Sequence, residues 1–156
     1  MNRLGNWIGE ACKIILPIHE ETFSGNPNST IAICTLSSLD LLRKIANSSL
    51  LNQISIAGRL LSENNGIDQI IRHVNRNRKI KTIIVCGKEV WGHRAGLSLF
   101  KLHKYGVDID GRIINSDSPD PFLTVTKSEI TYFQKEINLI NLINETDFNK
   151  IKQRII

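Results

Sequence analysis

Apolar residues along this chain alternate between short continuous runs and longer stretches with helical spacing. Continuous runs at residues 30–36, 54–61 and 80–86 are typical of strands that are buried on both faces. After a short polar stretch, each run is followed by apolar residues three or four positions apart, as in an amphipathic helix. The pattern therefore predicts three successive strand–helix units, and Gly106 is expected to end the third helix.

The rest of the pattern extends the same alternation to the C-terminus. The further elements that it predicts are a strand at residues 112–115, a helix at 128–137, a strand at 138–143 and a helix at 147–156. Five strands alternating with helices predict an α/β fold, namely a Rossmann-like, doubly wound and mostly parallel sheet with helices on both faces. We divide the chain into an irregular N-terminal arm, residues 1–29, packed on an α/β domain, residues 30–156.

Composition narrows the class of protein. The three cysteines, Cys12, Cys34 and Cys86, are far apart and form no CxxC pair, which favours free thiols and a cytoplasmic location. No apolar stretch reaches the roughly 18 residues of a membrane-spanning helix, so no membrane span is expected in this chain. The net charge of +5 includes a basic patch at residues 72–81, but no nucleic-acid-binding motif accompanies it. We therefore expect no nucleic-acid partner.

Common catalytic motifs are absent from the sequence. It contains no Walker A sequence and no GxGxxG, GxSxG or HExxH motif, which disfavours P-loop, dinucleotide, serine hydrolase and zinc-protease chemistry. Open parallel sheets bind ligands beyond the carboxyl ends of their strands. The search for a site therefore narrows to the loops expected there, at residues 35–38, 62–66, 87–92 and 115–121.

One of these loops, within residues 86–96, has an unusual composition. It places three glycines, Glu89 and His93 at the start of the third helix. Glycines allow a ligand to approach the backbone closely, and an imidazole nitrogen can bind a transition metal. One histidine supplies too few bonds for a metal site made by protein alone, but it suffices as an axial ligand when a macrocycle supplies four nitrogens. This favours a haem or corrinoid over zinc, whereas the alternative is that His93 only packs in the first helical turn.

Several other conspicuous side chains have ordinary structural explanations. His19 falls in the arm, His73 is placed on the polar side of the second helix, and His103 lies in a last helical turn, where a cation suits the helix dipole. Cys86 is expected to be a small buried residue. Trp91 either stacks on a cofactor edge or packs between helix and sheet.

Five segments in the same order resemble a known family. Residues 31–36, 58–67, 86–96, 111–114 and 121–122 together resemble the A subunit of tetrahydromethanopterin S-methyltransferase, the corrinoid-carrying component of a methanogen membrane complex. The resemblance covers roughly residues 30 to 140. It implies a methyltransferase of one-carbon metabolism that carries the methyl group on cobalt and works with other subunits.

The resemblance also assigns roles to residues. It implies a cobamide, a vitamin B12-type corrinoid, at the crevice of the sheet, with His93 as the catalytic and cobalt-ligating residue. Glu89 either orients the imidazole as an acceptor or is an acid that suits the N-terminus of a helix. The residues then expected to contact the cofactor are Gly58, Ser62, Glu63, Asn64, Gly66, Gly87, Glu89, Gly92, Gly96, Pro121 and Phe122.

The chain departs from the family in two places, and two other functions stay open. The C-terminus is an amphipathic charged segment where the family has a hydrophobic membrane anchor, and the loop at residues 117–122 is more acidic than expected. The first alternative is a binding module that stores or senses a cobamide or nucleotide without methyl transfer. The second is a nucleic-acid-binding protein that uses the basic patch.

Overall fold

The computed structural model describes residues 21–155, and these residues form one five-stranded sheet. The strands are β1 (Thr22–Ser24), β2 (Ile31–Cys34), β3 (Ile56–Gly58), β4 (Thr82–Gly87) and β5 (Asn138–Ile143). Their order across the sheet is β1-β3-β2-β4-β5, and only the edge strand β1 runs antiparallel to its neighbour. The predicted five-stranded, mostly parallel sheet is confirmed.

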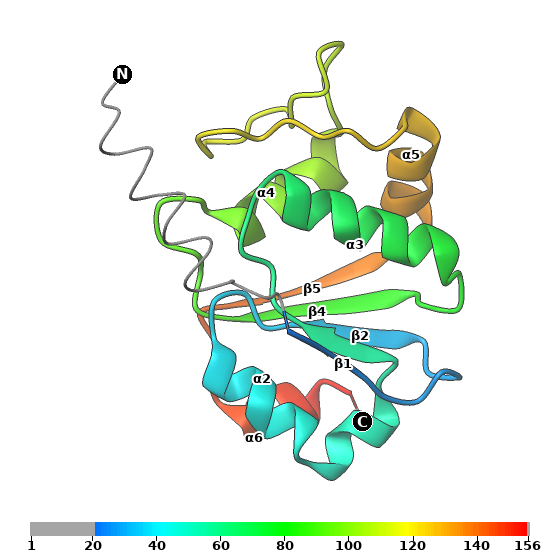
Figure 1. Cartoon of the computed structure of the whole chain (residues 1–156), viewed down its shortest axis with the longest axis vertical. Coiled ribbons are helices and arrows are strands. Elements are labelled where there is room, and N and C mark those ends of the chain that lie inside the picture. The colour runs from blue at the N-terminus through cyan, green and yellow to red at the C-terminus, as the bar shows by residue number, and fades with distance from the viewer. Residues whose placement is uncertain (1–20, 156) are drawn as a thin grey trace, which may run out of the picture.

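Helices cover both faces of this sheet, as Figure 1 shows. One face carries α2 (Leu39–Ala46), the short 3-10 helix η1 (Ser49–Gln53) and α6 (Phe148–Gln153). The other face carries α3 (Asn65–Arg76), α4 (Ala95–Tyr105) and α5 (Lys127–Glu136). The α/β class and the helical layers on both faces are therefore as predicted.

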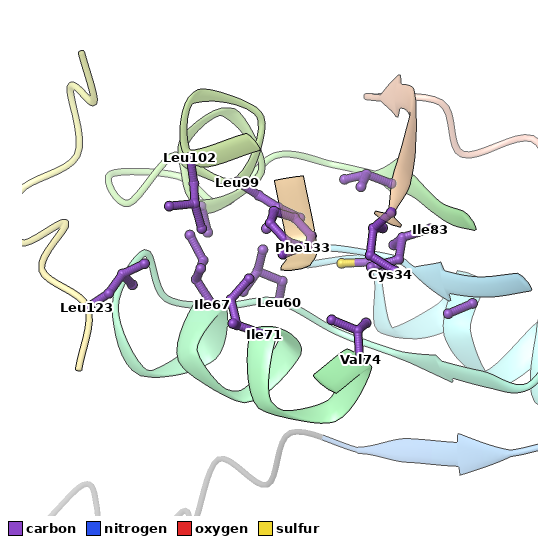
Figure 2. Close-up of a cluster of buried hydrophobic side chains, with 14 of the residues drawn as sticks. Cys34, Leu60, Ile67, Ile71, Val74, Ile83, Leu99, Leu102, Leu123 and Phe133 are labelled. Atoms are coloured by element: carbon purple, nitrogen blue, oxygen red, sulfur yellow. The ribbon is translucent and has the colours of Figure 1, made fainter. Parts of the chain in front are cut away.

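Two apolar cores follow from the alternation of side chains along the buried strands. In β2, Ile33 packs in the core beneath α2, whereas Ala32 and Cys34 belong to the core beneath α3 and α4. Figure 2 shows part of this second core, in which Ile67, Ile71 and Val74 from α3 face Leu99 and Leu102 from α4, with Phe133 of α5 among them. Because both faces of each strand are buried, the sequence reads there as a continuous apolar run.

One predicted strand is wrong. Residues 112–115 do not join the sheet, because their backbone pairs inside the long connection between α4 and α5. Ile113 donates its N–H to the Pro121 carbonyl at 2.8 Å, and single β-bridges link Arg112 to Phe122 and Val107 to Ile113. The fifth strand is instead β1, three residues that the sequence analysis assigned to the irregular arm. Edge strands need little apolar patterning, so this one gave no signal.

Residues 1–20 of the predicted N-terminal arm, and residue 156, lie outside the described residues. Among residues 21–155, none of the helices has the length and apolar character needed to cross a bilayer.

Candidate functional site: an imidazole held at the carboxyl edge of the sheet

Loops from several strands meet at the carboxyl edge of the sheet, as the parallel arrangement predicts. The hydroxyl and the N–H of Ser37 both donate to the Lys88 carbonyl, at 2.8 and 3.1 Å. The Thr35 N–H donates to the Gly58 carbonyl at 2.9 Å. These bonds join the loops after β2, β3 and β4 into one surface, and residues 106–126 complete it.

His93 lies in the turn before α4, and its imidazole contacts Glu63 from the loop after β3. The Nδ1 atom is 2.8 Å from the Glu63 Oε2 atom. The Glu63 side chain is only 1% exposed, whereas the His93 side chain is 53% exposed. A carboxylate accepts, so Nδ1 carries the proton and the lone pair of the neutral ring is on Nε2. Within residues 21–155, Nε2 has no hydrogen-bond partner.

Glu63 uses both of its oxygens in this site. While Oε2 faces the imidazole, Oε1 accepts the backbone N–H of Asp120 at 2.9 Å. The Asn64 side-chain amide donates to the Asp120 carboxylate at 3.0 Å. Glu63 and Asn64 therefore tie the loop after β3 to the connection before α5, and Asp120 is a site residue that the sequence analysis did not single out.

Three buried serines form a chain of hydroxyl groups that ends at the backbone carbonyl of His93. The Ser118 hydroxyl donates to the His93 carbonyl, and the Ser98 Oγ atom is 2.6 Å from both Ser116 Oγ and Ser118 Oγ. Each hydroxyl has one proton, so Ser118 must accept from Ser98, and Ser98 must accept from Ser116. The sequence analysis missed this chain of hydroxyls, because three serines spread over two segments make no motif.

Glu89 does not contact His93. Its carboxylate accepts the N–H groups of Val90, Gly96 and Leu97 at 2.7, 3.0 and 2.8 Å. The Gly96 and Leu97 amides lie at the start of α4, where helical backbone donors lack intrahelical partners, whereas Val90 lies in the loop before it. Of the two interpretations of Glu89, the one as an acid at the N-terminus of a helix is confirmed and the one as the acceptor that orients His93 is wrong, because Glu63 is the acid that contacts the imidazole.

The three glycines of the loop have different roles. A Cβ at Gly87, which has a φ of +78°, would lie 2.1 Å from the Thr35 carbonyl oxygen, and one at Gly96 would lie 2.9 Å from a Glu89 oxygen. These two positions are glycine because the protein itself fills the space. A Cβ at Gly92, which has a φ of +79°, would meet no described atom within 4 Å. Only Gly92 therefore leaves room beside His93.

None of the remaining predicted contact residues hydrogen-bonds to His93, and two of them, Gly58 and Gly66, line a groove beneath α3 to which His93 does not contribute. Ser62 accepts the Gly66 N–H at 2.7 Å, so both residues shape the start of α3. Gly58 packs against β1, where a Cβ would lie 2.9 Å from a Thr22 methyl group. Pro121 is buried, and Phe122 is 44% exposed. Their contact with a cofactor stays a prediction.

Trp91, two residues from the imidazole, is 95% exposed. It therefore does not pack between helix and sheet, and of the two expectations only contact with a cofactor stays open.

Two other histidines and one cysteine are accounted for by the fold. His103 bonds the Ile137 carbonyl at 2.7 Å through Nε2 and lies edge-on to the Phe133 ring. Burial raises the pKa of the Cys86 thiol well above its ordinary value, as expected for an inert buried residue. His73 is not on the polar side of α3 but faces a groove, and burial lowers its pKa.

A metal site made by protein side chains alone is not found among residues 21–155, where no group of three or more His, Cys, Asp or Glu side chains lies together. The site instead offers one imidazole nitrogen that is held in place and open to the outside. Such a nitrogen can complete the coordination of a metal whose other ligands come from a bound cofactor.

Residues 15–156 match the family model that describes the A subunit of tetrahydromethanopterin S-methyltransferase. Curated relatives include one of two A subunits of this enzyme in Methanothermobacter thermautotrophicus, which is 36% identical over 84% of this chain and 54% of its own length. The A subunit of Methanocaldococcus jannaschii is 34% identical over 84% of this chain and 54% of its own length. The chain thus spans about half of the length of these two curated relatives.

Proposed function

This chain belongs to the family of tetrahydromethanopterin S-methyltransferase A subunits, and we propose that it carries a cobamide whose cobalt takes His93 Nε2 as an axial ligand. The observation that supports the proposal most strongly is the imidazole itself. Its Nδ1 atom is held at 2.8 Å by a buried carboxylate, and its Nε2 atom is without a partner among the described residues. Metal-ligating histidines usually donate the second ring N–H to a carboxylate or carbonyl, because this fixes the tautomer and the ring orientation.

The donor set suits a corrinoid better than a free metal ion. A corrin ring supplies four equatorial nitrogens, so the protein needs to add only one, and one is what the site offers. A Cβ at Gly92 would meet no described atom within 4 Å, so the space at this position is open, and the apolar side chain of Trp91 beside it is 95% exposed. The buried position of Glu63 keeps the second ring nitrogen in a fixed hydrogen bond, so only Nε2 remains for the metal.

A bound cobamide would supply the cobalt that accepts and releases the methyl group. The residues of this chain would bind and orient. Glu63 would keep the Nδ1 proton on the ring, so that Nε2 presents its lone pair, and the Asp120 N–H would fix the carboxylate. Ser118 would hold the His93 carbonyl and thereby set the position of the imidazole. A movement of the imidazole would act first on the connection between α4 and α5, because Ser118 and Asp120 of this connection bond to His93 and to its partner Glu63.

The methyl donor and the methyl acceptor concern the whole methyltransferase, of which we propose that this chain is one subunit. The family description names tetrahydromethanopterin and an S-methyltransferase reaction, which implies a methylated pterin as donor and a thiol as acceptor. We propose that partner subunits bring both to the cobamide that this chain carries.

Electron paramagnetic resonance of the protein with cob(II)alamin tests the axial ligand directly. The unpaired electron of cobalt(II) couples to an axial nitrogen, and ¹⁴N gives a triplet where ¹⁵N gives a doublet. We expect the triplet of the complex to become a doublet when the protein is made with ¹⁵N-histidine. His93→Ala should remove the protein-derived coupling, whereas His19→Ala should leave it unchanged.

A triplet that persists with ¹⁵N-histidine would overturn the proposal, because the nitrogen would then come from the nucleotide base of the cobamide. A second assay separates a methyl carrier from a binding module. With partner subunits and a methylated pterin, a carrier takes up the methyl group, and the visible spectrum of the cobamide changes. A pure storage or sensing protein would bind the cobamide and show no such change.

A further inference from the structure

A groove lies between α3 and the β1 edge of the sheet, and His93 does not contribute to it. Its volume is about 210 Å³. Apolar side chains make most of its walls, among them Ile56, Ile70, Val74, Ile80 and Ile83. Thr22 of β1 and Gly58 of β3 border it at the edge of the sheet, on the face where Figure 1 shows α3. An apolar groove of this size is a surface that a protein normally covers.

Two polar atoms in the groove lack partners. The Arg59 Nε and the His73 Nε2 atoms are buried, and neither has a hydrogen-bond partner among the described residues. Both side chains line the groove. Buried polar atoms in native proteins almost always have partners, so these two point to an acceptor for Arg59 Nε and a polar partner for His73 Nε2 that the described residues do not supply. Burial also lowers the pKa of His73, so the ring is neutral near pH 7 and is not a second cation.

We propose that residues 14–18 of this same chain, Ile-Ile-Leu-Pro-Ile, cover the groove. The segment is apolar throughout, and it ends four residues before Thr22, which itself borders the groove. Four extended residues span at most about 14 Å, so the segment cannot lie far from the groove entrance. Its backbone carbonyls supply acceptors for Arg59 Nε, and Pro17 has no N–H that an apolar wall would leave unpaired.

The length of the segment suits the groove. α3 has 12 residues and is therefore about 18 Å long. Five extended residues cover about 17 Å. One continuous stretch of residues 14–18 can therefore contact the whole underside of the helix.

Covering the groove has a consequence for the site. The loop that holds Ser62 and Glu63 leads directly into α3, and the groove lies beneath this helix. The segment would therefore hold α3 on the sheet and help to keep Glu63 beside His93. This inference does not depend on cobamide binding. A result that contradicts the covered groove would leave the proposed function unchanged, and a failure to bind cobamide would leave the covered groove unchanged.

Thiol labelling of the full-length protein tests the proposal. In a Cys12→Ser background, Ile15→Cys or Ile18→Cys places a reporter in the segment, and Asn2→Cys places one near the N-terminus. Cys34 and Cys86 are buried, so they do not react with the reagent while the protein is folded. We expect the reporters at positions 15 and 18 to react with dithionitrobenzoate about tenfold more slowly, or slower still, than the reporter at position 2.

A groove variant shows where any protection comes from. Ile70→Arg places a charge in the groove wall and should bring the labelling rates at positions 15 and 18 up to the rate at position 2. Asn52→Arg, an exposed position on η1 across the sheet, should leave them slow. Because Ile70→Arg also removes an apolar contact of α3, Gln69→Trp serves as a second variant, since it fills the groove from an exposed position.

Three results would overturn the assignment. In the first, all reporters react equally fast in a folded protein, as judged by circular dichroism. In the second, protection survives both groove variants. In the third, protection depends on protein concentration, which would place the segment on a second copy of the chain.

Discussion

The buried carboxylate of Glu63 holds Nδ1 of His93 at 2.8 Å, although 30 positions separate the two residues in the chain. One residue follows β3 and the other follows β4, so neither loop alone makes the pair. The sheet brings the loops together, because parallel strands place their carboxyl ends on the same edge. The imidazole is therefore fixed by the fold of the domain and not by its own helix.

Glu63→Gln should weaken the site at two contacts at once. Glu63 accepts from the His93 ring and from the Asp120 N–H, and a glutamine has only one acceptor oxygen for these two donors. We expect a loss of about 1–3 kcal/mol in the free energy of unfolding, since the group is buried. Cobamide affinity should fall about 10- to 100-fold.

Urea unfolding and a spectrophotometric cobamide titration measure the two effects of Glu63→Gln. Glu89→Gln is the matched control, because that carboxylate caps α4 without contacting the imidazole. Unchanged cobamide affinity in the Glu63 variant would show that the carboxylate does not orient the ring.

Ser118→Ala should loosen the backbone at His93. The variant removes the hydroxyl that donates to the His93 carbonyl, so that carbonyl loses its partner and Ser98 keeps only Ser116. We expect a loss of about 1–3 kcal/mol in the free energy of unfolding. Faster amide hydrogen exchange confined to residues 91–97 would identify the cause, and Asp110→Ala at an exposed position of the same connection should show neither effect.

Gly87→Ala and Gly92→Ala form a matched pair, because both glycines have a φ close to +78°. An alanine at position 92 has open space and should cost only the backbone strain, about 1–2 kcal/mol. An alanine at position 87 also collides with the Thr35 carbonyl and should cost more than about 4 kcal/mol. Thermal unfolding of the two variants compares them, and equal melting temperatures would contradict the assigned difference.

His73→Gln should change how stability depends on pH. Burial and Arg76 lower the pKa of His73 from 6.5, so the unfolded chain binds the proton more readily than the folded one. The contribution is therefore complete above pH 6.5 and is lost as the pH falls through the window below it. We expect the variant to lose less stability than the wild type between pH 7 and pH 5 in urea unfolding. Identical pH profiles would show that His73 does not titrate differently in the folded state.

The periodic part of the fold could be predicted because strands that are buried on both faces appear in the sequence as continuous apolar runs. Each of β2 and β4 is an apolar run, and α3 and α4 begin after polar loops where the pattern places them. β1 and residues 112–115 could not be predicted correctly. Strand formation there depends on which backbone groups find partners, and the Ile113 N–H finds one at Pro121.

The candidate site was only partly predictable for a similar reason. His93, Glu63 and Asn64 stand out because their loops follow buried strands, and all three are in the cluster that the structure shows. The sequence suggests Glu89, an acid close to His93 in the chain, as one candidate for orienting the imidazole, whereas the acid that contacts the imidazole is Glu63. Sequence separation carries no information about contacts across a sheet edge, and the serine contacts behind His93 have the same origin.

The carboxylate of Glu89 has a further consequence at the start of α4. In many nucleotide-binding sheets, the free amides of a helix N-terminus hold the phosphate of the ligand. Here an acid of the protein already occupies those amides with its negative charge. A pyrophosphate approaching this turn would meet the negative charge of Glu89 in place of free Gly96 and Leu97 donors, while the neighbouring imidazole stays accessible.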